Sequence, residues 1–164
     1  MRQIRFFLLI LAASNVLLLS CGGSKTETPA ESSATSTQNM TRTDATSHFY
    51  VDQIGTISNP AIDKEISILS TRPLVVSGWA ADLAGAPASG VEITIDQKPY
   101  PATYGVDRPD VAAALKDPSY GKAGFQASIP ANQFSNGAHV LTVRIINKDR
   151  NSYFETPAFH LRIQ

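Results

Sequence analysis

The chain has 164 residues, with 14 lysines and arginines against 14 aspartates and glutamates, 43% hydrophobic residues and one cysteine. This length suits one globular domain with an additional segment, rather than two full domains. The balanced charge excludes the clustered lysine and arginine on which binding to phosphate backbones depends, so we expect no nucleic acid partner. A single cysteine excludes an internal disulfide bond and a zinc site built from several thiolates.

The amino terminus has the organisation of a secretory signal peptide. Arg2 and Arg5 precede an apolar run, Phe6–Leu19, and no acidic residue occurs before Glu27. The apolar run is shorter than the roughly 20 residues that a membrane-spanning helix needs. We therefore expect residues 1–20 to direct export and then to be removed.

The sequence Leu18-Leu19-Ser20-Cys21 ends this segment. It resembles the lipobox of bacterial lipoproteins, although Leu19 is bulkier than the small residue usual at its position. The resemblance implies that the Cys21 thiol is diacylglycerylated and that acyl chains such as palmitate on Cys21 hold the protein on the membrane. Because Gly22 rather than an aspartate follows, it also implies delivery to the outer membrane in a bacterium with two membranes. The alternative is a generic signal peptide with an incidental cysteine.

Residues 21–47 have the composition of a tether. Twelve of the 26 residues from Gly22 to Ser47 are serine or threonine, and Met40 is their only large apolar side chain. Burial of so little apolar surface does not offset the entropy of ordering, which is about 1–2 kcal/mol per residue. We expect these residues to form a disordered connection between the acylated Cys21 and a folded domain.

Residues 48–164 are predicted to form that domain from short strands. Glycine and proline separate runs rich in valine, isoleucine, threonine and aromatic residues, which favours strands over helices. The predicted strands are Tyr50–Ser58 (interrupted at Gly55, with Glu65–Ser70 as its continuation), Leu74–Ala80, Val91–Asp96, Tyr100–Tyr104, Phe125–Ile129, His139–Ile146, and a last strand formed by Tyr153-Phe154 and Phe159–Ile163 and broken at Pro157. Leu74–Ala80 is apolar on both faces, so we expect a strand away from the sheet edge. Short strands with a turn after each predict an all-β sandwich.

One short helix is predicted in a connection between strands, at Asp107-Arg108-Pro109-Asp110 and the residues that follow. We expect Asp107 to accept hydrogen bonds from the first turn, and Pro109 to fit there because its φ is already near the helical value. Asp110 is expected to complement the helix dipole. Asp117-Pro118 should end the helix, since proline cannot continue it.

Four stretches of the domain carry a recognisable pattern: Val76–Asp82 (VSGWAAD), Tyr104–Ala112 (YGVDRPDVA), Gly124-Phe125 and Asn136–Arg144 (NGAHVLTVR). Together they resemble a bacterial immunoglobulin-like module of secreted and surface proteins, which is also appended to membrane enzymes. The resemblance implies an immunoglobulin-like antiparallel β-sandwich with a contact or spacer role and no catalytic residues. Because the paired cysteines of antibody domains are absent, we expect core packing, including Trp79, to replace that disulfide.

The residue patterns predict no catalytic site and no cofactor. A histidine site needs two or three histidines that converge with carboxylates or cysteine, and the spacing of the three histidines does not predict one. These are His48, His139 and His160. Ser119–Lys122 has the spacing of a Ser-x-x-Lys motif, but it follows a proline in a predicted loop instead of lying on a helix.

Acidic residues and tyrosines are the candidates for two further kinds of ligand site. Asp107, Asp110 and Asp117 lie near the predicted helix, but their spacing does not match a calcium-binding loop, so no metal is predicted. Tyrosines beside loops could serve as flat stacking surfaces for a glycan, or they could cover the edge of the core with the hydroxyl in water. These candidates are Tyr100, Tyr104, Tyr120 and Tyr153.

These observations favour a lipid-anchored cell-envelope protein whose sandwich serves adhesion, scaffolding or recognition without catalysis. Its partners would be the membrane, through Cys21, and an envelope protein or glycan. Two alternatives stay open: an accessory protein or small enzyme acting on envelope polysaccharide or peptidoglycan, and a structural spacer. A pocket with converging ionisable groups would favour the enzyme, and an exposed aromatic patch would favour the binding module. The absence of both features would favour the spacer.

Overall fold

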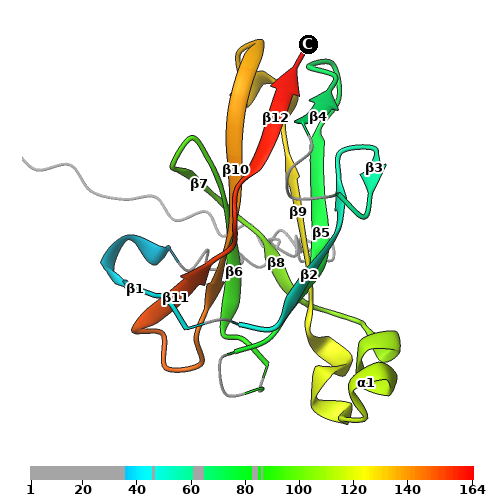
Figure 1. The fold of residues 1–164 in the computed structure, drawn as a ribbon, viewed down its shortest axis with the longest axis vertical. Helices are drawn as coiled ribbons and strands as arrows, with labels where there is room; N and C mark the ends of the chain where they lie inside the picture. Colours follow the sequence, from blue (N-terminus) through cyan, green and yellow to red (C-terminus); the bar gives the residue numbers. More distant parts are fainter. Residues whose placement is uncertain (1–35, 46, 61–64, 83–84, 86) are drawn as a thin grey trace, which may run out of the picture. The chain divides into compact units, whose positions relative to one another are not determined.

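The computed structural model describes residues 36–45, 47–60, 65–82, 85 and 87–164. Their strands form two sheets that pack face to face (Figure 1). The prediction of an all-β sandwich with one short helix in a connection is confirmed. The predicted signal peptide and lipobox lie outside the described residues. Within the described part of the chain, no helix is both long enough and apolar enough to cross a membrane.

The first sheet is centred on the longest described strand. Its seven strands are β1 (Thr41–Thr43), β4 (Glu65–Ile68), β6 (Gly90–Ile95), β7 (Lys98–Pro101), β10 (Gly137–Ile146), β11 (Ser152–Glu155) and β12 (Phe159–Ile163). β10 pairs with β6, β11 and β12 in antiparallel register. β1 runs parallel to β11, and β4 runs parallel to β12. The sheet is therefore mixed at its edges, where the sequence predicted antiparallel pairing throughout.

The second sheet has the strand order β3-β2-β5-β9-β8. These strands are β2 (Phe49–Ile54), β3 (Ile57–Ser58), β5 (Leu74–Ala80), β8 (Thr103–Val106) and β9 (Gly124–Ile129). β5 lies between β2 and β9, as its apolar sequence predicted. Gly55, with a φ of 60°, belongs to the turn between β2 and β3. The strand predicted at Tyr100–Tyr104 is in fact divided between the two sheets, because the chain crosses from β7 to β8 at Ala102.

Among the described residues, the helical segments are α1 (Pro109–Leu115) and three 3-10 helices, η1 (Thr37–Asn39), η2 (Pro118–Lys122) and η3 (Ala131–Gln133). α1 and η2 connect β8 to β9 at one end of the second sheet (Figure 1). The expected cap of α1 is wrong. Arg108 occupies the cap position without a side-chain hydrogen bond to the helix backbone, and Asp107 instead pairs with Lys122 at 2.7 Å.

The apolar core lies between the sheets and is built from alternate residues of each strand. Its largest completely buried side chains include Phe125, Ile93 and Leu141. Trp79 does not belong to this core. Because its neighbours on β5 point inward, Trp79 points to the outer face, where it is half-buried and packs against a smaller cluster of Ala81, Val111, Tyr120 and Ala123.

The folded region begins earlier than predicted. The sequence placed residues up to Ser47 in the tether, yet η1 and β1 are ordered elements, and Thr37 is only 3% exposed. The Thr41 amide donates to the Asn151 carbonyl at 2.9 Å, where β1 extends the sheet. This segment is held by backbone pairing and polar contacts. An argument from apolar content does not detect such contacts.

Gly78 permits the closest approach between β2, β5 and β9. A Cβ atom at this position would collide with the Tyr50 carbonyl oxygen and lie 2.8 Å from Cζ of Phe125. We predict that Gly78→Ala lowers the free energy of unfolding by about 1–3 kcal/mol, the range typical of overpacked cores. Gly121→Ala is the control, because a Cβ there meets nothing within 4 Å. Urea unfolding of both variants measures the difference; equal midpoints would contradict the packing described here.

Candidate functional site

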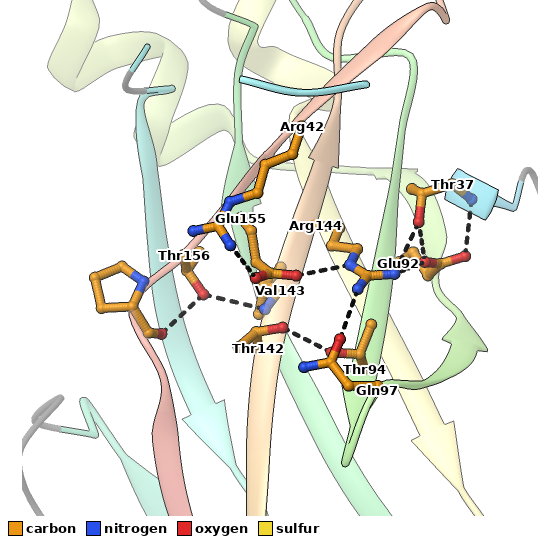
Figure 2. A network of polar contacts seen from close by, with 11 residues as sticks. Thr37, Arg42, Glu92, Thr94, Gln97, Thr142, Val143, Arg144, Glu155 and Thr156 are labelled. Carbon is orange, nitrogen blue, oxygen red and sulfur yellow. Dashed lines mark hydrogen bonds and ion pairs between the residues drawn. The ribbon is translucent and has the colours of Figure 1, made fainter. Parts of the chain in front are cut away.

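Each sheet carries a polar cluster on the face turned away from the core. On the first sheet, Arg144 of β10 lies in register between Glu92 of β6 and Glu155 of β11. Figure 2 shows its guanidinium between the two carboxylates, with Nε donating to Glu155 Oε2 at 2.8 Å and Nη1 donating to Glu92 Oε1 at 3.3 Å. Burial opposes the charge of Arg144, but its hydrogen bonds to these carboxylates outweigh burial and raise its pKa above the ordinary value.

The amino-terminal segment closes this cluster. The Thr37 hydroxyl donates to Glu92 Oε1 at 2.6 Å and accepts a hydrogen bond from Arg144 Nη1 at 3.0 Å (Figure 2). Arg42 of β1 pairs with Glu155 at 3.1 Å. Glu92 is 3% exposed, so these contacts satisfy a carboxylate that water scarcely reaches. The cluster is therefore filled by the protein's own chain, and we assign it a structural role.

We predict that Thr37→Val loosens the amino-terminal segment, because it removes the hydroxyl that pairs with buried Glu92. An unsatisfied buried polar group typically costs about 1–3 kcal/mol. Hydrogen exchange of residues 37–43 should accelerate, while exchange in β5 stays unchanged. Thr41→Val is the matched control, since the Thr41 side chain is exposed. Unchanged exchange in Thr37→Val would show that the Thr37 hydroxyl does not hold the segment.

The outer face of the second sheet is open. A hollow of about 260 Å³ lies on it, lined among others by Asp52, Gln53, Ser77, Val106, Arg108 and Gln126. These residues come from β2, β5, β8, β9 and the start of α1. Register shifts bend the two strands that flank the hollow, between Val51 and Gln53 in β2 and between Tyr104 and Val106 in β8. β-Bulges of this kind commonly redirect side chains next to functional surfaces.

Arg108 binds carboxylates from two separate elements. Its Nη1 donates to Asp52 Oδ2 of β2 at 2.6 Å, and its Nε and Nη2 donate to the Asp110 carboxylate of α1 at 2.9 and 2.8 Å. These hydrogen bonds lower the pKa of Asp110 to about 2 and raise that of Arg108. A Cβ on Gly124 would lie 2.9 Å from Cγ of Arg108. Gly124 of the recognised pattern thus leaves room for the arginine.

The tyrosines proposed as stacking surfaces do not form one exposed platform. Tyr100 and Tyr120 are buried, with 9% and 7% exposure. Tyr104 is partly buried, and its hydroxyl donates to the Ala80 carbonyl at 2.7 Å and accepts from the Ala88 amide at 3.0 Å. Burial raises the pKa of Tyr104 to about 12. Tyr153 lies under the Arg144 guanidinium, 5.1 Å from ring centroid to Cζ.

The acidic residues near α1 are engaged separately. Asp107 pairs with Lys122, Asp110 with Arg108, and Asp117 accepts from the Ser119 amide at 2.8 Å, which caps η2. Across the ranges that the structure describes, no group of three or more histidine, cysteine, aspartate or glutamate side chains could hold a metal ion.

Of the histidines, His139 has the most defined surroundings. Its Nδ1 lies 2.6 Å from Asp96 Oδ2, and its Nε2 lies 2.9 Å from the Ser135 carbonyl oxygen. The hydrogen bond to Asp96 raises the pKa of His139, because it favours the protonated ring. Asp96 also accepts from the Val140 amide at 2.9 Å, so this contact joins the β6–β7 turn to β10.

Sequence reasoning missed the hollow and its polar residues. Gln53, Ser77 and Gln126 are ordinary surface residues in the sequence, and only strand pairing brings them side by side. Tyr50 is 48% exposed on β2, although its sequence context indicates only the start of a strand. One signal was available: the polar positions of Phe125–Ile129 alternate with its apolar ones, which indicates an exposed outer face.

No family model matches the chain, and no curated protein matches it. An endo-β-1,4-mannanase from Thermotoga petrophila aligns in structure over 74% of this chain and 20% of its own, with a TM-score of 0.44 and 6% identity. A lytic polysaccharide monooxygenase from Jonesia denitrificans aligns over 62% of this chain and 58% of its own, with a TM-score of 0.37 and 10% identity. The chain therefore spans less than two thirds of either structure.

Proposed function

We propose that this protein is a lipid-anchored component of the bacterial cell envelope whose β-sandwich is a non-catalytic recognition module. The resemblance of Leu18-Leu19-Ser20-Cys21 to a lipobox supports an anchor on Cys21. Gly22 supports the outer membrane as its destination in a bacterium that has two membranes. The sandwich would then present its outer faces to other envelope components.

The observation that carries recognition is the difference between the two outer faces. The polar cluster around Arg144 is closed by Thr37 and Arg42 of the same chain. The second sheet instead leaves a hollow in which the side chains of Ser77 and Gln126 make no hydrogen bond to any described residue. A recognition module needs a concave surface with unengaged polar groups, and this hollow supplies both features.

The hollow also argues for binding rather than catalysis. Its ionisable side chains are Asp52 and Arg108, which are joined to each other at 2.6 Å. A general acid or base must be free to exchange a proton with a reacting group. Asp52 is engaged by the Arg108 guanidinium rather than left open to a reacting group. This supports recognition over the alternative of a small enzyme.

We predict that Cys21→Ala abolishes acylation, because it removes the thiol that would carry the lipid. The full chain should then move from the detergent phase to the aqueous phase on Triton X-114 partition. Ser20→Ala is the matched control, since it keeps a small residue before the cysteine and should leave the protein in the detergent phase. A Cys21→Ala protein that still partitions with detergent would refute the anchor.

We predict that filling the hollow abolishes recognition of the envelope. Ser77→Arg places a long charged side chain at its centre, and Ser128→Arg places the same side chain at another outward position of the sheet, on β9. The full chain in detergent should sediment with washed envelope fragments, and Ser77→Arg should lose at least about tenfold in affinity, or about 1.4 kcal/mol. An equal loss of affinity in both variants, or no loss in either variant, would contradict recognition through this face.

A further inference from the structure

The centre of the hollow is a row of uncharged hydrogen-bonding side chains. Strand pairing places Gln53 of β2 opposite Ser77 of β5, and Ser77 opposite Gln126 of β9. All three residues line the hollow. Amides and hydroxyls both donate and accept hydrogen bonds. The row therefore offers alternating donors and acceptors over the width of three strands.

Most of this hydrogen-bonding capacity is free. Gln53 Nε2 donates to the Gly55 carbonyl at 2.6 Å, which fixes the side chain and leaves its amide oxygen available. The side chains of Ser77 and Gln126 make no hydrogen bond to any residue that the structure describes. Ser77 lies on the central strand of the sheet, so its backbone is held in place before any ligand arrives. Preorganised groups of this kind lose little entropy on binding.

The charge around the row disfavours ionic ligands. Arg108 is the cationic side chain among the residues lining the hollow, and it is engaged by Asp52 and Asp110. Two carboxylates facing one guanidinium leave no uncompensated positive charge for a phosphate, sulfate or carboxylate ligand. An anionic ligand would instead meet the outer oxygens of these carboxylates. The electrostatics thus favour an uncharged ligand that is rich in polar groups.

Apolar surface lies beside this polar row. Val75 and Val106 contribute to the lining of the hollow. Two residue pairs further along β2 and β5, Tyr50 lies opposite Trp79 on the outer face. Tyr50 is 48% exposed and Trp79 is half-buried. A sugar ring matches this combination, because its hydroxyls need both donors and acceptors while its C–H face packs on aromatic or aliphatic groups.

We propose that the outer face of the β2-β5-β9 sheet binds a neutral saccharide, with one sugar ring in the hollow held by Gln53, Ser77 and Gln126 and the adjoining chain passing over Tyr50. The proposal rests on the proposed recognition function and names its ligand class. The hollow of about 260 Å³ lies just below the range of about 300–1,000 Å³ for small-molecule sites, which suits a single ring better than a folded protein surface. A protein partner is the competing outcome.

The test is isothermal titration of the full chain in a sugar-free detergent with neutral tetrasaccharides of glucose, mannose, galactose and N-acetylglucosamine. Tetragalacturonate, which is anionic, is the ligand control. At least one neutral tetrasaccharide should bind saturably, and tetragalacturonate should not. Gln126→Ala should weaken binding about tenfold, the effect of losing a hydrogen bond worth about 1.4 kcal/mol. Ser128→Ala, on the same face of β9 but outside the hollow, should stay within about twofold.

Absence of saturable binding by every neutral tetrasaccharide would overturn the proposal, as would equal affinity of Gln126→Ala and the unchanged chain. Binding of tetragalacturonate as tight as that of the neutral sugars would overturn the charge argument. The envelope sedimentation of Ser77→Arg separates this proposal from the recognition function. If sedimentation depends on Ser77 while no sugar binds, recognition stands with a protein partner and the saccharide assignment fails.

Discussion

The structure depends on the packing of two sheets around one apolar core without a covalent cross-link. The chain has one cysteine, so no intrachain disulfide can join its sheets. The sheets are instead held together by interdigitated apolar side chains. Examples are Phe125, Ile93 and Leu141, each at most 1% exposed. Gly78 lets the β2 backbone and the Phe125 ring approach closely at the centre of the second sheet. Strand alternation then sends every other side chain outward, and these outward residues make the two outer faces different.

On the first sheet the outward residues create a requirement for cover. Glu92 and Arg144 are charged side chains on a face that water scarcely reaches, and such groups need partners. The segment containing Thr37 and Arg42 supplies them. β1 of this segment runs along β11, where Arg42 pairs with Glu155. On the second sheet Arg108 is satisfied by Asp52 and Asp110, which leaves the neutral row of Gln53, Ser77 and Gln126 available.

Sequence reasoning succeeded where a single strand carries its own signal. Leu74–Ala80 and Phe125–Ile129 were placed correctly, because period-two alternation or a continuous apolar run reports burial directly. It was wrong where partners came from elsewhere in the chain. Asp107 has the sequence context of a helix cap, but Lys122 binds it. Trp79 is the largest apolar side chain in its strand, but its position in the alternation turns it away from the main core. Tyr100 and Tyr120 are buried by contacts that their positions beside loops do not reveal.

The sequence by itself determined the all-β class, the central strands and the short helix, because these follow from local periodicity and turn chemistry. It also supplied the resemblance to a lipobox at Cys21. Only the tertiary structure decided where the fold begins, which charged residues are covered and which polar residues remain open. Those properties depend on contacts between residues far apart in the chain, such as Thr37 with Glu92 and Arg108 with Asp52, and local sequence patterns do not specify such pairs.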